Sequence, residues 1–234
     1  MEKELTYKKA KSIKYFFHRQ LWHFLFLIIL VYLTWKFANP TIQNNTWLSI
    51  SSNTWFWLSV AFTIFHQVIV WIVFRLQLGW ATLTKIFKSY DQYIWAIIFL
   101  PLLISRPIFI IGLANSTSNT LPISKSILII IGIILIIPAL YTLWSVLKYF
   151  KIMRALGGDH FRVPYRKMPM VDKGAFKYSS NAMYSYAFLL LYSIALFYAS
   201  QPALIVAIFQ HIYIWIHYYC TEKPDMDIIY GNNS

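Results

Sequence analysis

Acidic and charged residues are scarce in this chain. Its 234 residues include 8 Asp and Glu against 21 Lys and Arg, and only 12% are charged, whereas soluble domains average about 25%. Hydrophobic residues make up 59% and aromatic residues 19%. This composition excludes an ordinary water-soluble domain and predicts an all-α integral membrane protein.

Several chemical classes lack the residues they need. The single cysteine, Cys220, excludes an internal disulfide and a multi-cysteine metal site, and we predict no bound metal. His-Glu-x-x-His, the Gly-x-x-x-x-Gly-Lys phosphate loop and the Gly-x-Gly-x-x-Gly dinucleotide fingerprint are absent, as is the Gly-x-Ser-x-Gly hydrolase motif. Whatever this protein binds is therefore not held by one of these common motifs.

Six apolar runs predict about six transmembrane helices, since roughly 20 residues cross a bilayer core. They cover residues 21–37, 55–74, 93–113, 127–147, 183–200 and 203–220. Only Gln201 and Pro202 separate the last two, a connection that joins antiparallel neighbours. The chain should end in a helical hairpin.

Basic residues are placed as a membrane topology requires. They precede the first run and occupy the second and fourth connections, while the first, third and fifth connections carry almost none. The positive-inside rule then places both termini in the cytoplasm. The charge of +13 is explained by topology and anionic lipids rather than by nucleic acid, and the first run is expected to be a retained anchor, not a cleaved signal peptide.

The chain divides into a basic cytoplasmic tail, 1–20, a four-helix unit, 21–147, and a C-terminal region, 148–234. Residues 148–182 are too polar to span a bilayer and too long for an ordinary connection, so we expect a functional loop over the cytoplasmic mouth of the bundle. Within the four-helix unit, Arg106 is a functional candidate because ionisable residues are costly in a membrane. His66 and Gln67 are interpreted as an interhelical hydrogen-bonding pair.

The open ends of the final hairpin should meet at the cytoplasmic surface. Asn181 and Tyr184 begin the fifth run, and Glu222 ends the sixth. The loop residues Asp159 and His160 are expected to enter the same region. At 100° per residue, a regular helix places Tyr218 and Glu222 on the same face as His211 and turns His217 elsewhere.

Three blocks of the C-terminal region resemble a known family in order and spacing. They are Leu156-Gly157-Gly158-Asp159-His160-Phe161, Phe176-Lys177-Tyr178 with Ser180-Asn181-Ala182-Met183-Tyr184, and Glu222-Lys223-Pro224 with Ile229-Tyr230. The pattern resembles the phosphatidylethanolamine N-methyltransferases over residues 149–231 and is also similar to isoprenylcysteine carboxyl methyltransferases. Two positions depart from it, because Ala182 replaces a proline and Lys223 replaces a second glutamate.

The resemblance implies an S-adenosylmethionine site formed by the loop and the hairpin. Glu222 would attract the cationic end of the cofactor, Tyr184 would offer a π face, and Asn181 would hold the methionyl carboxylate. The full predicted set for the cofactor is Glu222, Asn181, Tyr184, Tyr178, Gly157, Gly158, Asp159 and Lys151.

An amine acceptor must lose a proton before it is methylated, and imidazole titrates near neutral pH. His160 is the first candidate base and His217 the second. The predicted substrate contacts are His211, Tyr218, Lys177 and Arg154. The acceptor would be a membrane lipid that enters from the bilayer.

Alternatives remain open on sequence alone. The preferred function is N-methylation of phosphatidylethanolamine or a related amino-lipid. A carboxylate, thiol or hydroxyl of an isoprenoid or other lipophilic molecule is the alternative acceptor, and a transporter or membrane scaffold is the alternative of another class. The oligomeric state is not indicated by the sequence.

Overall fold

The computed structural model describes residues 5–231, so residues 1–4 of the predicted basic tail lie outside the described part. Five helical segments are long and apolar enough to cross a membrane, and Met183–Phe197 forms a shorter apolar helix. The five segments are Ile13–Thr41, Ser52–Trp80, Thr82–Ser116, Lys125–Phe150 and Gln201–Tyr230. The prediction of an all-α membrane fold is confirmed.

The principal helices follow the six predicted runs. They are α3 (Gln20–Ala38), α4 (Ser52–Trp80), α6 (Asp91–Ser116), α7 (Lys125–Ser145), α11 (Leu189–Phe197) and α12 (Gln201–His217). Shorter elements are η1 (Lys8–Ala10), α2 (Ile13–Phe16), η2 (Asn39–Thr41), β1 (Thr46–Trp47), β2 (Ile50–Ser51), α5 (Thr82–Phe87), η3 (Lys88–Tyr90), η4 (Val146–Phe150), α8 (Ile152–Ala155), α9 (Gly158–Phe161), α10 (Val163–Arg166), η5 (Gly174–Lys177), η6 (Met183–Ala187), η7 (Tyr218–Glu222) and α13 (Lys223–Tyr230).

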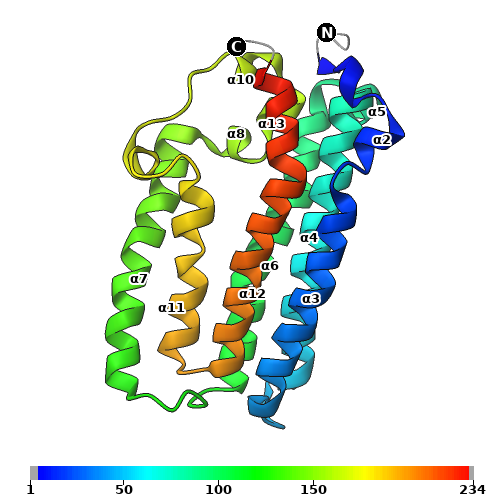
Figure 1. The fold of residues 1–234 in the computed structure, drawn as a ribbon. Coiled ribbons are helices and arrows are strands. Elements are labelled where there is room, and N and C mark those ends of the chain that lie inside the picture. The colour runs from blue at the N-terminus through cyan, green and yellow to red at the C-terminus, as the bar shows by residue number, and fades with distance from the viewer. Residues whose placement is uncertain (1–4, 232–234) are drawn as a thin grey trace.

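Helix α12 lies at the centre of the bundle. It packs against α3, α4, α6 and α11, and α7 packs on the outer side of α11 (Figure 1). Ala195, Ala203 and Ala207 are completely buried at these contacts, where small side chains let membrane helices approach closely. The outward side chains of α7 include Ile130, Ile134 and other exposed apolar residues, as expected for contact with lipid.

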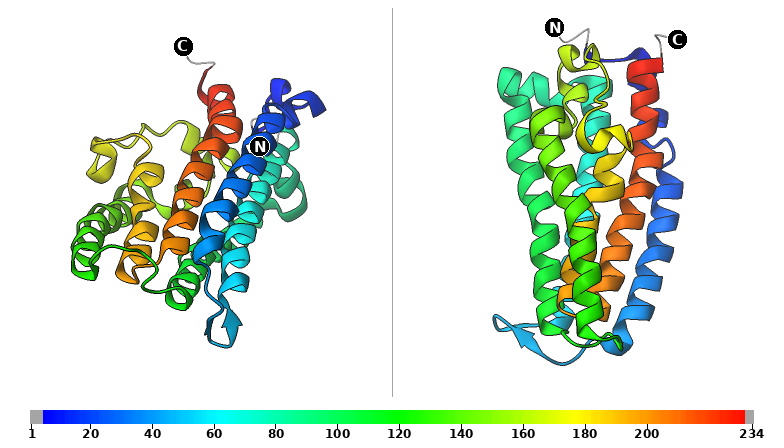
Figure 2. Two further views of the ribbon diagram at one scale, coloured as in Figure 1. Left: turned by 60° about the horizontal axis from the view of Figure 1, so that its bottom comes forward. Right: turned by 90° about the vertical axis from the view of Figure 1, so that its left-hand side faces the viewer.

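The two ends of the bundle differ. The α2 and α13 segments, near the two chain termini, lie at the same end as the loop helices α8 and α10 (Figure 1). The turns of the opposite end, including the antiparallel pair β1 and β2, protrude away from them (Figure 2). The predicted C-terminal hairpin is present: α11 and α12 pack on each other, and the Ser200 hydroxyl accepts the Ala203 amide at the start of α12.

The long loop is packed tightly onto α4 and α6. Trp95 of α6 donates its indole N–H to the Leu156 carbonyl over 2.8 Å. Gly157 has φ +81°, and a β-carbon added there would lie 2.2 Å from the Phe74 ring of α4. A left-handed backbone with no room for a side chain requires glycine at this point.

Three π-helical turns lie where the bundle meets the loop. They are η4 at the end of α7, η6 before α11 and η7 after α12. Such wide turns are rare and are frequently found at functional sites. Because a π turn has i to i+5 hydrogen bonds, it brings residues five positions apart close together, which a regular α-helix would not do.

Candidate functional site

Glu222 is the centre of a polar cluster between the fifth and sixth predicted spans. The Tyr184 hydroxyl of η6 donates to Glu222 Oε2. His217 Nε2 lies 3.6 Å from Glu222 Oε1, and only 19% of the Glu222 side chain is exposed. The predicted meeting of Tyr184 with Glu222 is therefore present, at the loop end of the bundle.

Aromatic rings pack around Tyr184, the residue that donates to this carboxylate. The Tyr184 ring lies 6.0 Å from Trp215 and 5.7 Å from Tyr218, centroid to centroid. The Asn181 side chain interacts with Tyr218. A carboxylate beside several π faces fits a sulfonium or ammonium cation, because both kinds of group attract positive charge. Trp215 was not among the predicted residues, although it lies one helical turn before Tyr218.

The predicted orientation of His217 is wrong. A regular helix would turn it away from Glu222, but the two side chains meet because η7 begins directly after His217 and widens the helix over the 5 residues that end at Glu222. His211 lies deeper and is held by α11 instead: its Nδ1 is 3.1 Å from the Tyr192 hydroxyl, and its ring stacks on Phe188 at 5.3 Å.

His160, the first predicted base, lies in a different buried network. Its Nε2 is 3.2 Å from Asp225 Oδ2, and its ring stacks on Phe74 at 4.0 Å. Asp225 Oδ1 also accepts from the Tyr15 hydroxyl at 2.7 Å and lies 3.2 Å from Arg75 Nε. The His160 imidazole thus joins the loop to α2, α4 and α13, whereas His217 is the imidazole beside Glu222.

Other predicted loop residues hold the loop together. Arg154 donates to the Pro169 carbonyl at 3.0 Å and lies 3.9 Å from Asp159. A β-carbon on Gly158 would lie 2.8 Å from the Tyr165 ring, so this glycine, like Gly157, permits close packing.

Three predicted binding residues lie on the surface of the loop. Lys151 and Lys177 are exposed, and 71% of Tyr178 is accessible. The Tyr178 ring therefore offers an open face rather than one wall of the cluster around Glu222. Loop position could not be predicted from sequence, since it depends on contacts with α4 and α6.

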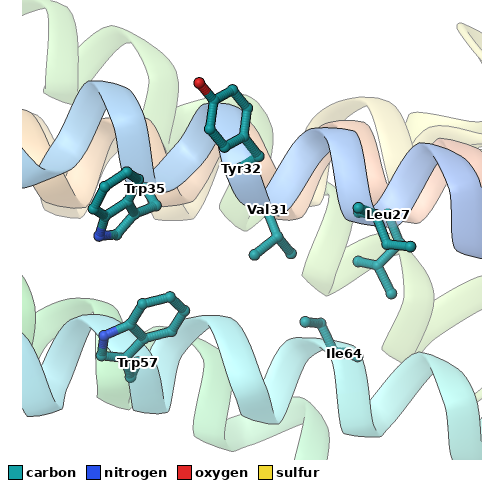
Figure 3. Close-up of a pocket in the computed structure, with 7 residues that line it drawn as sticks. Leu27, Val31, Tyr32, Trp35, Trp57 and Ile64 are labelled. Carbon is teal, nitrogen blue, oxygen red and sulfur yellow. The ribbon is translucent and has the colours of Figure 1, made fainter.

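An apolar groove lies apart from this cluster. It has a volume of about 410 Å³ between α3 and α4, with Leu27 and Val31 facing Ile64, and Trp35 facing Trp57 (Figure 3). None of its lining residues belongs to the cluster around Glu222. Within residues 5–231, no group of three His, Cys, Asp or Glu is placed to hold a metal ion.

One comparison with known proteins bears on this region. Residues 127–233 match the model of a family described as phospholipid methyltransferase. The match runs from α7 to the end of α13 and contains Tyr184, His217 and Glu222. It confirms the resemblance found in the sequence and supports a membrane phospholipid methyltransferase in general terms. No curated protein and no solved structure matches the chain.

Proposed function

From the match of residues 127–233 to the phospholipid methyltransferase family, we propose that this membrane protein transfers a methyl group from S-adenosylmethionine to the amine of phosphatidylethanolamine or a related amino-lipid. The reaction takes place at the loop end of the bundle, which the basic residues assign to the cytoplasm.

The observation that carries this proposal is the shielded carboxylate of Glu222. An acidic side chain in the apolar part of a membrane protein is costly unless it has a partner. Glu222 has a phenol and an imidazole beside it but no Lys or Arg within salt-bridge distance in the described part of the chain. Its negative charge is thus available to a bound cation.

The cluster fits the methyl donor by its chemistry. When bound, S-adenosylmethionine supplies a methyl group on a cationic sulfonium. Glu222 attracts the positive charge of the methionyl end, and Tyr184, which donates to it, adds a π face whose ring lies 5.7 Å from that of Tyr218. Only 19% of the Glu222 side chain is exposed, and limited access of water strengthens electrostatic contacts.

His217 is the better-placed candidate for proton removal. Methylation forms an N–CH₃ bond as the S–CH₃ bond breaks, and the acceptor must be a free amine because an ammonium has no electron pair to donate. Neither ring nitrogen of His217 has a hydrogen-bond partner within residues 5–231, so the neutral imidazole can accept the proton from the lipid ammonium. Lys177 and Lys151, exposed on the loop, complement the anionic membrane surface.

The cofactor half of the proposal is tested by calorimetric titration of the purified protein in detergent with S-adenosylhomocysteine. Wild-type protein should bind it at micromolar concentrations, and Glu222→Gln should lose the binding. Asp227→Asn is the matched control, because Asp227 is an exposed acid on the neighbouring α13. If Glu222→Gln binds like wild type, Glu222 is not part of the site.

The acceptor half needs an activity assay. Methyl transfer to phosphatidylethanolamine in mixed micelles is compared with transfer to a prenylated cysteine. The variant His217→Gln, which leaves the structural contacts of His160 intact, should lose transfer to the amine. The carboxyl acceptor would be favoured by two results together: wild type shows little transfer to the amine, and the variant still methylates the cysteine carboxylate.

A further inference from the structure

Arg106 is a buried cation with no acidic partner among residues 5–231. It lies near the middle of α6, only 3% of it is exposed, and no acidic residue of the described chain forms an ion pair with it. Two of its guanidinium nitrogens, Nε and Nη2, are buried with no hydrogen-bond partner within residues 5–231. Because a guanidinium stays protonated in proteins, this arrangement is costly unless the charge has another use.

The surroundings of Arg106 are also polar and unsatisfied. The Tyr213 hydroxyl on α12 and the imidazole of His66 on α4 have no hydrogen-bond partner in the described chain. Arg106 interacts electrostatically with His66 and Tyr213. The interhelical hydrogen bond predicted for His66 is therefore not formed between described residues. Buried polar atoms are normally paired, so this gathering on three helices indicates a binding site.

Arg106 is connected to the cluster around Glu222 through Tyr184. The Tyr184 hydroxyl donates to Glu222, and the same residue interacts electrostatically with Arg106. The Arg106 guanidinium also lies 5.6 Å from the ring of Phe188, one turn after Tyr184. Glu222 and Arg106, which carry opposite charges, thus both interact with Tyr184.

We propose that Arg106 binds the anionic oxygen group of a zwitterionic ligand whose cationic end lies at Glu222. Arginine suits this role because its planar fork donates two parallel hydrogen bonds to a carboxylate or phosphate. Within the proposed function, on which this inference rests, the anion is either the methionyl carboxylate of the cofactor or the phosphate of the lipid head group. Arg106 precedes residue 127, so it lies outside the region that matches the family.

Arg75 shows what a structural arginine looks like in the same bundle. It is equally buried, but it pairs with Asp225 at 3.2 Å and donates to the Tyr15 carbonyl at 2.9 Å. Arg75→Met is therefore the matched control. It should lower the melting temperature, because it leaves Asp225 without its cation, whereas Arg106→Met should keep or raise the melting temperature of ligand-free protein.

The test measures two ligands on each variant by calorimetry. Arg106→Met should bind S-adenosylhomocysteine about 10- to 100-fold more weakly, the range for one charge-assisted hydrogen-bonded contact. It should bind methylthioadenosine, which lacks the ammonium and carboxylate, like wild type. This pair of results identifies the methionyl carboxylate as the anion. Arg106→Lys, which keeps the charge without the fork, should weaken binding by a smaller factor and serves if the Met variant does not fold.

Other results would assign Arg106 to the lipid phosphate, contradict this inference, or contradict the proposed function. Unchanged affinity for S-adenosylhomocysteine with a raised KM for phosphatidylethanolamine assigns Arg106 to the lipid phosphate. If both quantities are unchanged while wild type binds and is active, the inference is wrong and the proposed function stands. If wild type binds no S-adenosylhomocysteine at all, the proposed function fails first and this inference falls with it.

Discussion

At the scale of single residues, Glu222 and Asp225 show how two similar side chains acquire different uses. They are three positions apart, at the junction of η7 and α13. Asp225 is completely buried and pairs with Arg75 and His160. Glu222 is contacted by Tyr184 and His217 and pairs with no Lys or Arg of the described chain. The sequence predicts a role for Glu222 through its motif, but it cannot reveal the partners of Asp225, which come from α2, α4 and the loop.

Asp225→Asn should destabilise the protein without removing a cofactor contact. The change leaves the Arg75 charge buried and unpaired, at a cost of about 3–5 kcal/mol. The melting temperature in detergent should fall markedly, whereas Glu222→Gln should change it little. Equal melting temperatures for Asp225→Asn and wild type would mean that the network around Asp225 does not stabilise the fold.

Replacing either histidine should also separate an effect on activity from an effect on stability. His217→Asn should lower kcat for the lipid amine by about 10²- to 10⁴-fold, the usual contribution of a general base, with the melting temperature retained. His160→Asn removes the stacking on Phe74 and should mainly lower the melting temperature. Rates are measured in mixed micelles at saturating cofactor. A larger kcat loss in folded His160→Asn than in His217→Asn would restore His160 as the first candidate base.

At the scale of elements, hydropathy predicts the positions of the long helices well but does not predict local helix geometry. The six apolar runs, the short connection after α11 and the contact between the two ends of the hairpin follow from length and composition alone. The π turns do not, because their sequences, such as Tyr-Tyr-Cys-Thr-Glu in η7, carry no signal that separates them from an α-helix. This is why the orientation of His217 could not be predicted.

The loop between η4 and η6 should depend on the close approach of Gly157 to α4. Gly157→Ala adds a methyl group against Phe74 and places alanine at φ +81°, which should cost about 1–3 kcal/mol by overpacking alone. Gly231→Ala is the matched control, since its added β-carbon would meet nothing within 4 Å. Thermal unfolding in detergent compares the two. A Gly157→Ala protein as stable as the control would show that the loop can move away from α4.

At the scale of the whole molecule, the region that matches the family does not pack on itself alone. Helix α12 contacts α3, α4 and α6, all of which precede residue 127. The ion pair between Arg75 and Asp225 joins a residue before position 127 to one after it. The proposed ligand would likewise contact Arg106 before this position and Glu222 after it. The division predicted at residue 147 stays a prediction, while the helix α12 that leads to the cluster around Glu222 packs against helices from both sides of it.

This interdependence predicts the behaviour of a cleaved protein. A protease site inserted between Ile123 and Ser124, which are exposed in the connection from α6 to α7, allows cleavage after the intact bundle has formed. The two fragments should stay associated in mild detergent, because membrane helices associate through packing once inserted, and the complex should bind S-adenosylhomocysteine like intact protein.

The C-terminal fragment, isolated after stronger detergent separates the pair, should not bind it, since α12 then loses its contacts with α3, α4 and α6. Full affinity in the isolated fragment would show that residues 127–233 form the site without the first three long helices.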